Sequence, residues 1–106
     1  MRIKHKSAHA TNDFLAALTL LSQDPDLLAE VLPQARAGNV HAQYAAGLIY
    51  AEGRGVEPDV IEAYLWLSRA LDQGDQDAGI LRKILMVNMV PAEIARAEQR
   101  LLEEVA

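Results

Sequence analysis

The sequence holds few side chains of the kinds that catalyse reactions or bind metal ions. It has three histidines, His5, His9 and His41, and no cysteine, which excludes disulfides and cysteine-based zinc sites. His5 and His9 are four residues apart, a spacing at which a helix would let them share a metal ion. They lie in a lysine-rich stretch without a carboxylate until Asp13, so a solvated tail is the better interpretation. His41 has no cysteine or aspartate neighbour at a catalytic spacing.

Three other short patterns suggest chemistry, and each has a better structural explanation. The segment Asp72–Asp77 holds three carboxylates around a glycine, but it lacks the extended ligand spacing and the closing glutamate of a calcium loop. The stretch Gly53–Gly55 could cradle a phosphate, but no strand precedes it and no Gly-Lys-Ser/Thr follows. Ser7, Ser22 and Ser68 lie outside any nucleophile motif. The sequence therefore predicts no enzyme, no metal site and no cofactor.

Composition favours a single all-α domain. The chain has 106 residues, about the usual size of one domain. Hydrophobic residues make up 51% of it but aromatic residues only 5%, because alanine and leucine carry the apolar content. Closely packed helices suit this composition better than a β-sandwich, which needs β-branched and aromatic residues.

The charge pattern argues against nucleic acids and membranes as partners. The net charge is −5, and Arg2, Lys4 and Lys6 at the N-terminus make the rest of the chain more acidic still. An acidic body is a poor match for a phosphate backbone, and no apolar run approaches the roughly 20 residues of a membrane span.

The start of the chain resembles a signal peptide, but Asp13 lies beside a short apolar run and no small-x-small cleavage site follows. These features favour a tail and a helix. We expect a cytoplasmic protein.

Start and stop signals divide the first half of the chain into three helices. Asn12 or Thr11 can cap the first, and Asp24-Pro25 opens a second that runs to Ala37 before Gly38. Pro33 removes a backbone hydrogen bond inside this second helix, so we expect a kink or break near Leu32. Asn39 caps a third helix that runs to about Ala51.

Three more helices are predicted in the second half. Asp59 and Glu62 have the spacing of a capping box, and Gly74 ends the helix that they open. Asp75 caps a fifth helix to about Asn88. Pro91 starts a sixth, whose apolar stripe is Ile94, Ala97, Leu101 and Val105.

An internal repeat relates these helices to one another. The segment Ala37–Ala42 is similar to Gln73–Ala78, 36 residues later, and each places a helix end, a glycine, a polar cap and a small alanine in the same order. The repeat predicts antiparallel helix pairs, which must stack because a single pair cannot bury its apolar face. The repeated unit carries a run of small, aromatic and turn residues at fixed spacing: Ala42, Ala46, Gly47, Tyr50, Gly53, Arg54, Gly55, Val56, Asp59, Ala63, Trp66, Ala70 and Gly74.

In order and spacing, this run resembles a Sel1-like repeat, a relative of the tetratricopeptide repeat. The resemblance implies an all-α fold of αα-hairpins, a short TPR/Sel1-like solenoid of about six helices with right-handed superhelical stacking. Residues 39–74 form its clearest repeat, 91–105 its C-terminal capping helix, 12–106 its single domain and 1–11 a flexible basic tail. The following repeat departs from the pattern at Arg82 and Lys83, where leucine and glycine are expected.

The elaborate turn between the two helices of the repeat has an architectural purpose in this interpretation. Gly47 with Ala46 and Ala63 lets the two helix backbones approach closely. We expect Gly53 and Gly55 to adopt positive φ, which is costly for other residues. Val56 then turns inward over the end of the helix pair, while Trp66 and Tyr50 are packing residues.

The function implied by the resemblance is protein–protein interaction through the concave face, which the first helix of each pair lines. The predicted partner-binding residues are His41, Tyr44, Leu48 and Glu52, and, one repeat later, Asp77, Ile80, Ile84 and Asn88. They would form an apolar groove with polar edges for a peptide or a partner helix. Two alternatives remain open: flanking helices cover Tyr44 and Leu48, or exposed faces join two copies into a homodimer that acts as a structural subunit.

Overall fold

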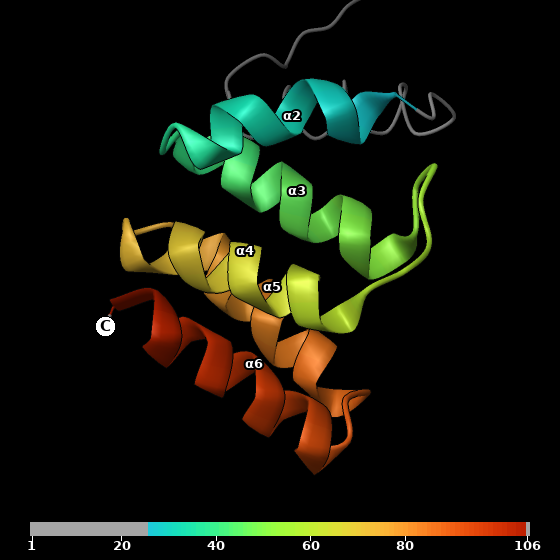
Figure 1. Cartoon of the computed structure of the whole chain (residues 1–106), viewed down its shortest axis with the longest axis vertical. Coiled ribbons are helices and arrows are strands. Elements are labelled where there is room, and N and C mark those ends of the chain that lie inside the picture. The colour runs from blue at the N-terminus through green and yellow to red at the C-terminus, as the bar shows by residue number, and fades with distance from the viewer. Residues whose placement is uncertain (1–25, 106) are drawn as a thin grey trace, which may run out of the picture.

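The computed structural model describes residues 26–105, and this part of the chain is helical with no strand. The expected tail 1–11, the first helix and the Asp24-Pro25 start lie outside the described residues. Figure 1 shows the described helices. They are α2 (Leu27–Arg36), α3 (Val40–Glu52), α4 (Val60–Asp72), α5 (Gln76–Val87) and α6 (Pro91–Val105). The all-α, helical-hairpin prediction is confirmed.

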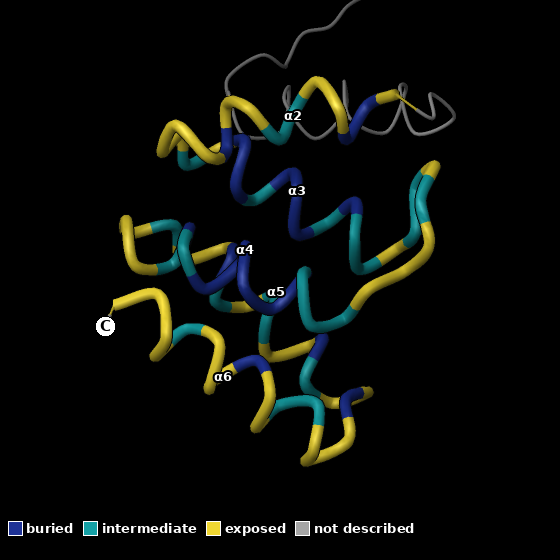
Figure 2. Tube along the Cα trace, viewed as in Figure 1, coloured by how far each residue is buried: buried dark blue, intermediate teal, exposed yellow. Residues whose placement is uncertain are grey.

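The helices stack along the long axis of the molecule. In Figure 1, α2, α3, α4 and α6 follow one another down this axis, and α5 lies behind α4. Helix α3 packs against α2 on one side and most closely against α4 on the other, and α4 also packs against α5 and α6. Figure 2 shows burial concentrated on α3 and α4, while α2 and α6 expose their outer sides. The 40–75 hairpin is therefore the centre of the stack.

Two clusters of buried side chains stabilise this arrangement, and alanine makes up half of each. The α2–α3 core consists of Leu27, Leu28, Ala35, Ala42, Ala45, Ala46, Ile49 and Trp66. The α4–α6 core consists of Ala63, Tyr64, Leu67, Ala70, Ala78, Leu85, Met89 and Ala97. Tyr50 packs against both cores and so joins them. Of the predicted stripe on α6, Ala97 is buried and Ile94 and Leu101 are half-buried, but Val105 is exposed.

Short polar side chains cap three of the helices where the sequence predicts them. The Asn39 side chain accepts a hydrogen bond from the Ala42 N–H at 2.9 Å, and Asp75 accepts one from the Ala78 N–H at 3.1 Å. Asp59 accepts from the N–H groups of Ile61 and Glu62. These bonds satisfy amide groups that have no partner within the helix.

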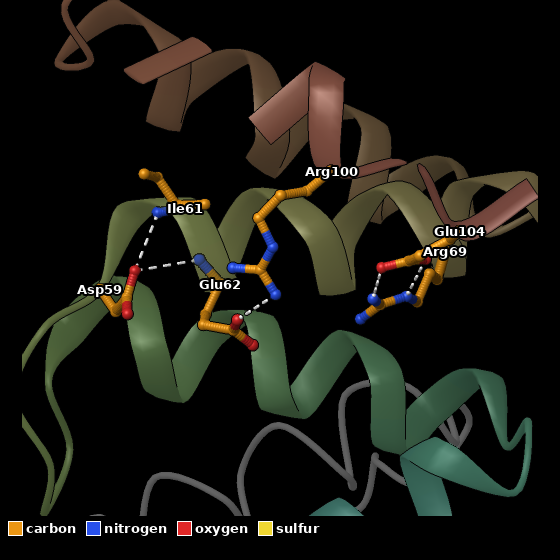
Figure 3. A network of polar contacts seen from close by, with 6 residues as sticks. All are labelled: Asp59, Ile61, Glu62, Arg69, Arg100 and Glu104. Atoms are coloured by element: carbon orange, nitrogen blue, oxygen red, sulfur yellow. Dashed lines mark hydrogen bonds and ion pairs between the residues drawn. The ribbon is translucent and has the colours of Figure 1, made fainter. Parts of the chain in front are cut away.

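The predicted capping box at α4 is wrong in its second half (Figure 3). A reciprocal bond would need the Asp59 N–H, but this group donates to the Tyr50 carbonyl at 2.9 Å. The Glu62 carboxylate instead pairs with Arg100 of α6 at 2.9 Å. Glu62 therefore connects two helices rather than closing the start of one.

Of the kink or break expected near Leu32, the break is wrong, because α2 continues through Pro33 to Arg36. Pro33 removes only its own hydrogen bond to the Ala29 carbonyl, and Ala29 is exposed to water that can satisfy this oxygen. Leu28 and Ala35 are buried against α3 on either side of the proline. Packing at both ends holds the helix together.

The turn between α3 and α4 has the predicted geometry. Gly53 and Gly55 have φ of 71° and 75°, in the left-handed region that favours glycine, and Val56 packs against the α2–α3 core. A Cβ at Gly47 would lie 2.7 Å from Cγ of Leu67 on α4. The close approach of α3 and α4 at this point is therefore confirmed.

Candidate protein-binding surface

The predicted partner-binding residues define what we call the α3–α5 surface, and α3 supplies its first half. His41 and Glu52 are exposed, whereas Tyr44 and Leu48 are half-buried. Leu48 packs against the α2–α3 core and Tyr44 against the α4–α6 core. The two large side chains of α3 therefore serve the interior as well as the surface.

Helix α5 supplies the second half, and here the apolar side chains are far more accessible. Asp77, Ile80, Ile84 and Asn88 are all exposed, with Ile80 at 59% and Ile84 at 57%. Val87 is 82% exposed and extends the same stripe, because positions 80, 84 and 87 lie on one side of a helix. The prediction missed Val87, although its spacing from Ile84 was readable in the sequence.

Acidic side chains of both halves affect the Tyr44 phenol. Burial raises the pKa of the Tyr44 phenol, and the negative charges of Asp77, Asp75 and Glu52 raise the pKa further. Asp75 and Asp77 belong to the start of α5, so the fold brings this end of α5 towards the tyrosine of α3. The phenol stays a neutral hydrogen-bond donor in an acidic environment.

Glu52 is engaged within the chain. Its carboxylate accepts a 2.5 Å charged hydrogen bond from Arg54 in the α3–α4 turn. This contact ties one polar edge of the α3–α5 surface to the glycine turn.

The alanines and Trp66 of the repeat motif lie in the interior rather than on this surface, whereas Gly55, Asp59 and Gly74 in its turns are exposed. Ala46, Ala63 and Ala70 are completely buried, and Trp66 is only 7% exposed. The Arg69 guanidinium lies 4.3 Å from the centre of the Trp66 ring, a favourable cation–π arrangement. Their burial fits the architectural role expected of them.

Residues 26–105 lack two further features. No group of three or more histidine, aspartate or glutamate side chains there could hold a metal ion. None of these helices is long and apolar enough to cross a membrane.

The sequence of the central hairpin matches a known family. Residues 40–75, from the start of α3 to the cap of α5, match the model of the Sel1 repeat. The chain is a Sel1-like repeat protein. The match covers the helix pair whose small contact residues, glycine turn and caps are described above.

Two bacterial proteins are similar to this chain over most of its length. The alginate biosynthesis protein AlgK of Azotobacter vinelandii is 37% identical over 86 residues, which are 73% of this chain and 19% of the relative. The alginate biosynthesis protein AlgK of Pseudomonas aeruginosa is 33% identical over 70 residues, 66% of this chain and 15% of the relative. The chain thus spans less than a fifth of the length of these relatives. No solved structure matches it significantly.

Proposed function

We propose that this Sel1-like chain is a protein-interaction module that binds a peptide or a partner helix through the α3–α5 surface. Sel1 repeat proteins generally act as protein-interaction scaffolds. Such proteins are generally non-catalytic, and we assign no reaction to this one.

The exposed stripe of α5 is the observation that carries the proposal. Ile80, Ile84 and Val87 are each more than half exposed and follow one another along one side of the helix. Contact with water is unfavourable for such a row of branched aliphatic side chains, and covering them would stabilise a complex. Anchors spaced along a helix face suit a partner helix laid against them.

The relatives suggest where a partner could be sought. Both are alginate biosynthesis proteins, so we propose that the partner belongs to a polysaccharide-producing assembly. The cytoplasmic location expected from the sequence stays a prediction.

The test compares three forms of the protein as bait in a bacterial lysate. The double variant Ile80→Ser/Ile84→Ser removes two of the three side chains of the stripe and leaves Val87. Because both changed positions are exposed, it should stay folded by circular dichroism. Leu102→Ser, which changes a 69% exposed leucine on α6, is the matched control. We expect mass spectrometry to find a protein retained by the wild type and the control but lost with the double variant. Equal retention by all three forms would contradict the surface.

Self-association is a second candidate, because α6 exposes apolar side chains at the end of the helix stack. Leu102 and Val105 of α6 are 69% and 82% exposed, and they border a cavity of about 590 Å³ between α4, α5 and α6. Arg82 and Glu98 line the same cavity, so it carries charges of both signs. A symmetric dimer needs such a self-complementary face, and light scattering measures its mass directly.

A further inference from the structure

A second cavity, lined by arginines, lies between α2, α3, α4 and α6. Its volume is about 460 Å³, within the usual range of ligand sites. Arg36 of α2, Arg69 of α4 and Arg100 of α6 all line it. We call it the arginine cavity. None of the residues of the α3–α5 surface lines it, so its role is independent of the function proposed above.

Two of the three arginines are neutralised within the chain (Figure 3). Arg100 pairs with Glu62 at 2.9 Å. Arg69 holds Glu104 with two nitrogens, and its Nε lies 3.2 Å from Oε1. Both pairs join α6 to α4, which keeps these arginines at the edge of the cavity.

Arg36 is different, because it makes no ion pair within residues 26–105. It is exposed at the last residue of α2. Among residues 26–105, the side chains that line the cavity and their ion-pair partners therefore carry a surplus of one positive charge, in a protein whose net charge is −5. A local charge opposite in sign to the whole chain indicates a place for an anionic group.

A buried donor without an acceptor gives an independent indication of a ligand. Trp66 lines the cavity and is only 7% exposed. Its indole Nε1 is buried and has no hydrogen-bond partner among the described residues. Buried N–H groups are nearly always paired, and leaving one unpaired is unfavourable. An acceptor brought by a ligand would satisfy it.

We propose that the arginine cavity binds a carboxylate side chain of an acidic segment in a partner protein. The planar guanidinium of Arg36 suits a carboxylate held by two hydrogen bonds, and the Trp66 indole supplies a further donor. A surplus of one charge matches a monoanion. The Glu62 carboxylate, already paired with Arg100, would oppose the second charge of a phosphate.

The indole N–H of Trp66 allows a direct test. Trp66 is the only tryptophan of the chain, so its indole gives a single assignable peak in a nitrogen–proton correlation spectrum. The probe is a blocked pentapeptide, acetyl-Ala-Glu-Ala-Glu-Ala-amide, added to the full-length protein. We expect the indole peak to shift and saturate with this peptide, and to stay in place with the peptide in which glutamine replaces both glutamates.

Matched variants distinguish binding in the arginine cavity from an effect of the overall charge of the protein. Arg36→Gln should weaken binding about tenfold or more, the effect of losing one charge-assisted contact. Arg96→Gln changes an exposed arginine of α6 that does not line the cavity, and it should bind like the wild type. Ile80→Ser/Ile84→Ser should also bind normally, so failure here and failure of the α3–α5 surface are distinguishable.

Several results would overturn the proposal. An indole peak that does not move at millimolar peptide would show that the cavity does not take a carboxylate. An equal loss of binding in Arg36→Gln and Arg96→Gln would reduce the effect to net charge. Saturation by sodium acetate at the same concentration as the peptide would indicate a free-anion site rather than a peptide site.

Discussion

Gly47 is the residue at which the packing of the central hairpin can be tested most sharply. Replacing a helical glycine with alanine normally stabilises a helix by about 1 kcal/mol. Here the new Cβ would lie 2.7 Å from Cγ and Cδ2 of Leu67, whose side chain is fully buried. We expect Gly47→Ala to lower the free energy of unfolding by about 1–3 kcal/mol, as overpacking usually does. Urea unfolding measures it.

Repeating the substitution in a Leu67→Ala variant tests whether contact with Leu67 causes the loss of stability. In Leu67→Ala, the obstructing side chain is gone, so adding Gly47→Ala should be neutral or stabilising. A cost of the same size in both backgrounds would mean that the two helices are not in contact through this pair.

At the scale of one helix, α4 allows the contributions of an N-cap and of an ion pair to stability to be measured separately. Asp59 accepts two backbone N–H groups, so Asp59→Ala should destabilise the protein by about 1 kcal/mol, the usual value of an N-cap. Glu62→Gln removes only the partly exposed pair with Arg100, for which we expect less than about 1 kcal/mol. Thermal unfolding in low salt and in 1 M NaCl distinguishes them, because salt weakens the Glu62–Arg100 pair strongly and the cap much less. An Asp59→Ala effect that disappears in high salt would contradict the cap.

The individual helices show which of their features can be predicted from the sequence. The caps at Asn39, Asp59 and Asp75 were predictable because a cap and its amide partner lie within three residues of each other. The partner of Glu62 was not, since Arg100 is distant in sequence and only the packing of α6 on α4 brings it near. Pro33 shows the converse, because a local rule for helix breaking gave way to burial of Leu28 and Ala35 against another helix.

For the whole molecule, the fold was predictable but the surfaces were so only in part. The repeated small residues and glycine turn were sufficient to indicate stacked helix pairs. The half-burial of Tyr44 and Leu48 depends on how neighbouring helices stack, which no single segment encodes. The arginine cavity was missed altogether, because Arg36, Arg69 and Arg100 come from three helices and share no motif.

The end of the stack formed by α6 gives the last prediction. If two copies pair through Leu102 and Val105, the melting temperature should rise with protein concentration, because association stabilises the folded state by mass action. Leu102→Glu/Val105→Glu would place four like charges across a symmetric interface, so we expect it to be a monomer in light scattering and to melt at a temperature that does not depend on concentration. Ile80→Ser/Ile84→Ser, which leaves this end intact, should behave like the wild type. A wild-type protein that is monomeric at millimolar concentration, with a constant melting temperature, would exclude this dimer and leave the exposed α6 face to a partner of different sequence.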